Sequence, residues 1–151
     1  MIYLWGTVLG GMLLALSYVD LREFRLPDII TFPLIGLGLI QSYLTANILP
    51  ALIGMAIGYA AFVGIAFAFK RLRGVDGLGR GDAKLLAAGG AWAGWMGLPM
   101  IVLIASLLGI VIALLGGLKK APREGVPDNW IPFGPCLAVG IFAVWTAGQI
   151  A

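Results

Sequence analysis

The stretch Gly79-Arg80-Gly81-Asp82-Ala83-Lys84 joins a charged segment of the chain to a long apolar run. A carboxylate at such a boundary needs a physical reason, because charge is costly to hold near hydrocarbon. One reason is local: Asp82 is the N-cap of a helix, and its side chain accepts backbone N–H groups. The other is chemical: Asp82 is one half of a site whose second half lies elsewhere in the sequence.

The composition predicts that the chain is surrounded by lipid. Hydrophobic residues make up 61% of the 151 residues and charged residues only 11%, whereas soluble domains carry about 25% charged residues. The mean hydropathy is +1.02. A soluble fold of this length has too little interior to hide so much apolar surface, so the predicted solvent is a bilayer.

The side chains available for chemistry exclude several mechanisms. The sequence has one cysteine, Cys136, and no histidine. It therefore forms no intrachain disulfide, and Ser–His and Cys–His nucleophiles are excluded within the chain. A structural zinc site normally takes several Cys or His ligands, so no metal and no cofactor are predicted.

Six apolar segments approach the length of about 20 residues that a membrane-spanning helix needs. Lipid cannot form hydrogen bonds with backbone N–H and C=O groups, and a helix pairs these groups within the segment. Each segment is therefore predicted to be a helix. The expected fold is an all-α polytopic bundle that forms one membrane domain over residues 1–151. The predicted spans are Ile2–Val19, Ile29–Ala46, Pro50–Phe69, Ala83–Gly97, Leu98–Leu118 and Ile131–Ile150.

The distribution of charge predicts the topology. All Lys, Arg, Asp and Glu residues fall within three segments, Asp20–Asp28, Lys70–Lys84 and Leu118–Trp130, whereas the connections near Asn47 and at Gly97–Pro99 carry no charge. The positive-inside rule places the three charged segments in the cytoplasm and both termini outside. The net charge of +3 is therefore loop charge beside membrane lipid, and no nucleic-acid partner is predicted.

Two pairs of glycines are spaced to lie on one helix face each. Gly54 and Gly58 form the first pair, and Gly90 and Gly94 form the second. Small residues four positions apart let membrane helices approach closely. We interpret both pairs as packing contacts.

Asp20 is the candidate partner of Asp82. It follows the first predicted span directly, and Asp82 directly precedes the fourth, so both carboxylates are expected on the same side and at the same membrane depth. Two adjacent carboxyl groups share one proton, because they cannot both ionise cheaply. The ionised member can take a proton from an attacking water, and the protonated member can donate to a peptide carbonyl. Taken singly, Asp82 could be a helix cap and Asp20 a charged residue where a span ends.

Three stretches of the sequence resemble the type IV prepilin peptidase family, in the family's order and spacing. Asp20-Leu21-Arg22-Glu23-Phe24-Arg25-Leu26-Pro27-Asp28 is similar to the family's first catalytic region. Residues 79–86, GRGDAKLL, resemble its GxGD motif, and residues 131–135, IPFGP, resemble its late proline–phenylalanine–glycine–proline motif. The resemblance covers essentially the whole chain.

The resemblance implies an aspartic endopeptidase of the inner membrane with Asp20 and Asp82 as catalytic residues. Such enzymes cut the basic leader from prepilins or pseudopilins after a glycine, at the cytoplasmic face. Gly79 and Gly81 are expected to admit the substrate backbone or to adopt a positive φ. Lys84 either contacts the substrate or extends to the interface as a lysine without other function. Arg22 and Pro27 complete the candidate substrate-binding or site-shaping residues, and Arg22 is also a topology determinant.

The chain also departs from the family's pattern. Many members carry an N-terminal region with paired CxxC cysteines that is associated with N-methylation, whereas this chain begins at its first predicted span and has a single cysteine. We therefore expect the short, peptidase-only form. Two alternatives stay open: a presenilin-like protease that cuts within transmembrane helices, and a small transporter that uses the acids as a proton or cation relay.

Overall fold

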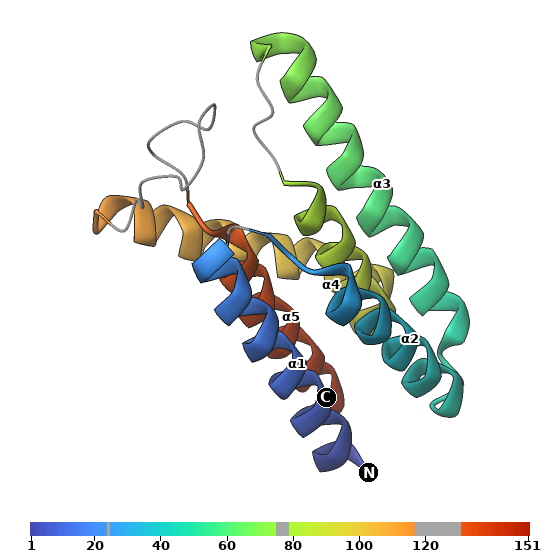
Figure 1. The fold of residues 1–151 in the computed structure, drawn as a ribbon. Coiled ribbons are helices and arrows are strands. Elements are labelled where there is room, and N and C mark those ends of the chain that lie inside the picture. The colour runs from blue at the N-terminus through green and yellow to red at the C-terminus, as the bar shows by residue number, and fades with distance from the viewer. Residues whose placement is uncertain (24, 75–78, 117–130) are drawn as a thin grey trace.

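The computed structural model describes residues 1–23, 25–74, 79–116 and 131–151. Within these ranges the secondary structure is helical, and no strand is formed (Figure 1). The predicted all-α class is confirmed. The helices are α1 (Ile2–Glu23), α2 (Asp28–Leu44), α3 (Ile48–Arg73), α4 (Arg80–Leu114) and α5 (Phe133–Ile150).

Most of these helices match the dimensions of a bilayer. In the described part of the chain, α1, α3, α4 and α5 are long and apolar enough to cross a membrane. α2 is apolar and has 17 residues, which corresponds to about 26 Å at 1.5 Å per residue. Large apolar side chains such as Leu14, Phe67 and Leu107 are exposed on the outside of the bundle, as expected where the surroundings are lipid. The chain is a multi-pass membrane protein.

The predicted fourth and fifth spans form a single element, α4, which is broken at Gly94. Its φ of 72° and ψ of 175° are not helical, and the two halves of α4 run in different directions (Figure 1). The predicted connection at Gly97–Pro99 is wrong, because these residues are helical. Membrane helices tolerate an internal proline such as Pro99, whereas a positive φ is adopted without strain by glycine. Residues 117–118 of the predicted fifth span lie outside the described residues.

Glycines allow α3 and the first half of α4 to approach each other closely. A Cβ atom added at Gly54 would lie 2.7 Å from the carbonyl oxygen of Gly90, and one added at Gly58 would lie 2.9 Å from that of Leu86. Neither distance is compatible with a real side chain. The packing interpretation is confirmed for Gly54, Gly58 and Gly90, whereas Gly94 forms the break in α4.

α2 packs against the other side of the same half-helix. The indole of Trp92 fills the space beside Gly38, where an added Cβ would lie 2.5 Å from Trp92 Cδ1. Trp92 Nε1–H donates a hydrogen bond to the carbonyl oxygen of Leu34 at 2.8 Å, and Ser42 Oγ donates to that of Ala91 at 2.9 Å. With α5 on its remaining side, α4 is the central element of the bundle.

The chain termini lie at one end of the bundle, and the described charged residues of the first and second motifs lie at the other. Both termini are at the lower end in Figure 1, where an added Cβ at Gly6 of α1 would lie 3.4 Å from the Trp145 ring of α5. The end of α1 and the starts of α2, α4 and α5 lie at the upper end. The predicted count of six spans and the predicted orientation of the termini stay predictions. Which side faces the cytoplasm stays a prediction, and the charged segment 118–130 lies outside the described residues.

Candidate active site

Asp20 lies in the last turn of α1 and is only 7% exposed. Its Oδ2 atom accepts a hydrogen bond from the backbone N–H of Gly134 at 3.1 Å. Gly134 belongs to the first turn of α5, which follows Pro132 as the N-cap. Because the first N–H groups of a helix have no partner within the helix, the start of α5 is a favourable place for a carboxylate.

Only glycine fits at position 134 in this arrangement. A Cβ atom added there would lie 2.5 Å from Asp20 Oδ2 and 2.9 Å from Asp20 Cγ. The neighbouring Phe133 stacks on Phe62 of α3, with ring centroids 6.3 Å apart. The third sequence motif therefore positions the start of α5, and with it the carboxyl group of Asp20.

Asp82 lies in the first turn of α4 but does not cap that helix. The N-cap is Gly79, with no side-chain capping bond, and the backbone N–H of Asp82 donates to the Gly79 carbonyl at 3.1 Å. The capping interpretation of Asp82 is therefore wrong. The Asp82 carboxyl group instead lines the same cavity as Asp20.

Both aspartates line one cavity of about 290 Å³ at the charged end of the bundle. A water molecule occupies about 30 Å³ of liquid, so the cavity has room for a substrate group together with water. Its walls come from the segment between α1 and α2, from the start of α4 and from the start of α5. The lining residues are Asp20, Arg25, Leu26, Asp28, Gly79, Arg80, Gly81, Asp82, Lys84 and Phe133.

The two glycines of the second motif have different roles. A Cβ at Gly81 would lie 2.8 Å from Leu26 Cβ, so Gly81 lets the start of α4 pack against the segment that precedes α2. A Cβ at Gly79 would lie 3.5 Å from Asp82 Oδ2, which is an ordinary contact. Gly79 has a φ of −69°, and Gly81 is not among the residues with positive φ. The predicted positive φ is wrong for both.

Lys84 extends into the cavity from the second turn of α4. Its Nζ atom lies 2.6 Å from Asp28 Oδ1 and 5.4 Å from the centroid of the Phe32 ring. The side chains of Lys84 and Asp28 are 28% and 55% exposed, so water screens this ion pair. The pair joins the second motif to the end of the first.

We expect the Lys84–Asp28 pair to contribute little to stability. Lys84→Gln and Asp28→Asn should each lower the free energy of unfolding by less than about 1 kcal/mol, as is typical of exposed ion pairs. The double variant should lose no more than the larger single effect, because both changes remove the same contact. Unfolding in detergent micelles measures all three. A coupling energy well above that range would show that the pair is a structural link of the site.

Arg22 and Pro27 are the predicted site residues that the structure does not bring into the cavity. The Arg22 guanidinium lies over the Tyr18 ring, with Cζ 5.0 Å from the ring centroid. Pro27 is the N-cap of α2, and its carbonyl accepts the backbone N–H groups of Ile30 and Thr31. Pro27 therefore fixes where α2 begins.

Sequence reasoning missed several residues of the site. Asp28 and Arg25 belong to the first motif, but Arg25 is predicted only as a topology determinant and Asp28 has no predicted role in the site. Phe133 and Gly134 belong to the third motif, whose individual residues have no predicted role in the site. The sequence does contain a feature that indicates this role: a glycine lies between two prolines where a helix is expected to begin. Without a side chain, a glycine there lets another group approach its backbone N–H. Among the described residues, no three His, Cys, Asp or Glu side chains gather as metal ligands.

Comparison with known proteins assigns the family. The profile of the type IV leader peptidase family matches residues 7–114. A prepilin leader peptidase/N-methyltransferase of Xanthomonas campestris pv. campestris is 43% identical over 146 residues, which cover 94% of this chain and 49% of the relative. The protein of the same name from Pseudomonas aeruginosa is 39% identical over 145 residues, covering 95% and 46%. No solved structure matches. The chain belongs to the type IV leader peptidase family, and it spans about half the length of these curated relatives.

Proposed function

We propose that this chain is a membrane aspartic endopeptidase that removes the basic leader peptide of a type IV prepilin or pseudopilin. The observation that carries the proposal is that Asp20 and Asp82, on separate helices, line a single cavity. The names of the relatives, prepilin leader peptidase/N-methyltransferase, support the substrate class.

In the proposed reaction the two carboxyl groups share one proton and activate a water molecule. Asp20 takes the ionised role, because its Oδ2 accepts the Gly134 N–H at the start of α5, which stabilises negative charge. Asp20 removes a proton from water, whose oxygen attacks the carbonyl carbon of the glycine that ends the leader. Asp82 donates its proton to the carbonyl oxygen. The C–N bond of the tetrahedral intermediate then breaks: the leaving amine takes the proton from Asp20, and a hydroxyl group of the intermediate returns its proton to Asp82 as the carboxylic acid product forms.

We further propose that the cavity faces the cytoplasm from the inner membrane. The described cations Arg25, Arg80 and Lys84 lie on its walls, and basic residues favour the cytoplasmic side. The same cavity is at the end of the bundle, where the substrate is accessible before its hydrophobic segment enters the bilayer. A proton or cation relay would instead require acids near the midplane.

Mapping the cleavage site tests this function against its nearest alternative. Purified protein in liposomes is incubated with a prepilin, and the new N-terminus is identified by mass spectrometry. We expect one cut, directly after the glycine that ends the basic leader and before the hydrophobic segment. A cut inside the hydrophobic segment would assign the chain to presenilin-like intramembrane proteolysis. Proton flux without any cleavage would assign it to transport.

Gly134→Ala is expected to lower the rate of leader cleavage by about 10- to 100-fold, because the new methyl group displaces the Asp20 carboxyl group. The cleavage rate at saturating substrate in detergent micelles measures the effect. Gly148→Ala on the same helix is the matched control, since nothing lies within 4 Å of its added Cβ. Equal rates for both variants would show that the contact between Gly134 and Asp20 does not position the carboxylate.

A further inference from the structure

An apolar groove lies on the outer surface of the bundle, between α1 and α5. The two helices run side by side along it (Figure 1), and its volume is about 310 Å³. α1 contributes four lining residues from Gly10 to Ser17, and α5 contributes four from Ala138 to Ala143. The proposed peptidase reaction uses none of these residues.

The groove is apolar and open to the surroundings of the bundle. Leu14, Val139 and Phe142 on its edges are 73%, 53% and 41% exposed, whereas Leu13 beneath them is buried. Ser17 is the one polar side chain among the described lining residues. An apolar cavity of about 150 Å³ can bind benzene, so this groove has room for more than one apolar side chain of a partner.

Small residues let another helix approach the groove closely. Half of the lining is small, at Gly10, Ser17, Ala138 and Ala143. Lipid gives apolar helices no hydrophobic reason to associate, so helices in a membrane associate where small residues permit close packing. The same feature brings α3 and α4 together in this bundle. The groove is therefore suited to one further transmembrane helix.

The groove begins one helical turn from the candidate active site. On α1, Ser17 precedes Asp20 by three residues. On α5, Ala138 follows Gly134 by four residues. Residues at these spacings are neighbours on a helix surface, and Asp20 and Gly134 contact each other. Gly10, at the other end of the groove, is about 15 Å from Asp20 along the axis of α1.

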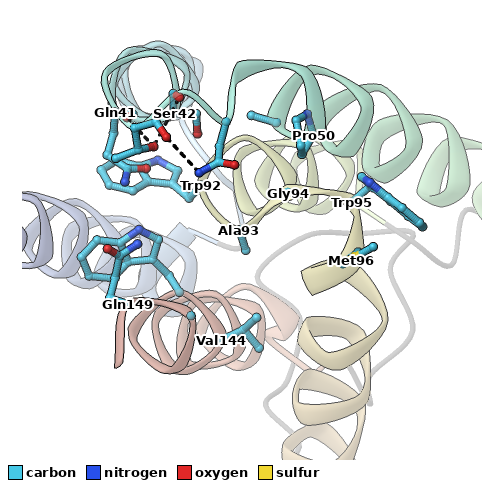
Figure 2. A pocket seen from close by; sticks show the side chains of 15 residues that line it. Gln41, Ser42, Pro50, Trp92, Ala93, Gly94, Trp95, Met96, Val144 and Gln149 are labelled. Carbon is cyan, nitrogen blue, oxygen red and sulfur yellow. Dashed lines mark hydrogen bonds between the residues drawn. The ribbon is translucent and has the colours of Figure 1, made fainter. Parts of the chain in front are cut away.

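The proposed reaction indicates which helix uses the groove. The peptide is cut beside Asp20, and the leader before the cut is basic, so it stays in the aqueous phase. The segment after the cut is hydrophobic and passes from the active-site cavity into the bilayer. α1 and α5 lead in that direction: past the groove, Val144 and Gln149 of α5 line a separate cavity at the far end of the bundle (Figure 2).

We propose that this groove binds the hydrophobic segment of the prepilin as a transmembrane helix and holds it while the bond at its start is cut. This inference rests on the proposed function. The contact involves about the first ten residues after the cut, because ten helical residues span the distance of about 15 Å between Asp20 and Gly10. Lipid acyl chains fill the groove when no substrate is bound.

Photocrosslinking in liposomes that contain prepilin tests the contact. Val139→Cys is labelled with a benzophenone maleimide, and the native Cys136 is protected because it is 2% exposed. Ile57→Cys is the matched control, since Ile57 is 46% exposed on α3. It lies at a similar depth, because Phe62 stacks on Phe133 and the two positions lie five and six residues from that contact. We expect several times more crosslinked prepilin at position 139, mapped to the start of the hydrophobic segment.

Val139→Trp fills the groove and measures its effect on the reaction. We expect the KM for prepilin to rise about fivefold to tenfold, with kcat within about twofold of the unmodified protein, because the groove contributes to binding and not to the chemical step. Ile57→Trp is the control, and its KM should stay within about twofold, as is typical of exposed substitutions away from a site.

The crosslinking and cleavage results separate this inference from the proposed function. Cleavage with equal crosslinking at positions 139 and 57 would overturn the groove and keep the peptidase function. Preferential crosslinking at position 139 without cleavage would support the groove and overturn the peptidase function. Crosslinks confined to the leader, or an unchanged KM in Val139→Trp, would also overturn the groove as the docking site.

Discussion

Replacing Asp82 with asparagine is expected to slow leader cleavage by about 100- to 10,000-fold, and Asp20→Asn should act similarly. The amide has nearly the same shape as the carboxyl group, but it can neither take a proton from water nor share one with its partner. Either change therefore removes half of the proposed acid–base pair. Single-turnover cleavage of a prepilin in liposomes, at equal amounts of folded protein, measures the loss.

Glu23→Gln is the control for this pair of substitutions. It makes the same isosteric change three residues after Asp20 on an exposed side chain of α1. Its cleavage rate should stay within about twofold of the unmodified protein, since exposed substitutions away from the site have small effects. Near-normal cleavage by either Asp20→Asn or Asp82→Asn would remove the two-aspartate mechanism, whatever the control shows.

The second large effect is expected at the contact between α3 and α4. Gly90→Leu should lower the free energy of unfolding by about 3 kcal/mol or more, because overpacking a tight helix contact forces the backbones apart. A Cβ at this position already collides with the backbone of Gly54, so no rotamer relieves the clash. Unfolding of the purified protein in mixed micelles, followed by circular dichroism, measures the change.

Gly64→Leu is the matched control for Gly90→Leu. Gly64 is on α3, the partner helix in this contact, and nothing lies within 4 Å of its added Cβ. We expect no loss of stability there, since leucine is a better helix former than glycine. If Gly90→Leu were as stable as Gly64→Leu, the close approach of α3 and α4 would not be a source of stability.

Sequence patterns predicted the helices well where hydropathy alone decides them. The predicted spans beginning at Ile2 and Pro50 match α1 and α3 to within a few residues at their apolar ends, because the length of an apolar run determines the length of a membrane helix. The prediction failed at α4. The break at Gly94 depends on one backbone conformation and on the contact of that glycine with Pro50, and neither leaves a signal in hydropathy.

The residues of the candidate site also divide into those that could be predicted from the sequence and those that could not. Asp20 and Asp82 could be proposed as partners from sequence, because each is the acid where an apolar run meets a charged segment on the same predicted side. The placement of Gly134 against Asp20 could not, since it depends on the approach of α5 to α1 across 114 positions of sequence. The pairing of Lys84 with Asp28 likewise depends on how α2 and α4 pack. The candidate catalytic residues could be predicted from the sequence. The residues that orient them could be identified only from the tertiary structure.

The break at Gly94 has a mechanical consequence. Asp82 and Gly94 are twelve residues apart, so the first half of α4 is a rod of about 18 Å. Its position is fixed by close contacts with α2 and α3 at Gly38, Gly54 and Gly58. The second half of α4 is also held, because an added Cβ at Gly140 of α5 would lie 2.8 Å from the carbonyl oxygen of Ile101. We therefore expect the two halves to keep their angle at the break as the bilayer becomes thicker or thinner, so that the separation of the two carboxyl groups is insulated from hydrophobic mismatch.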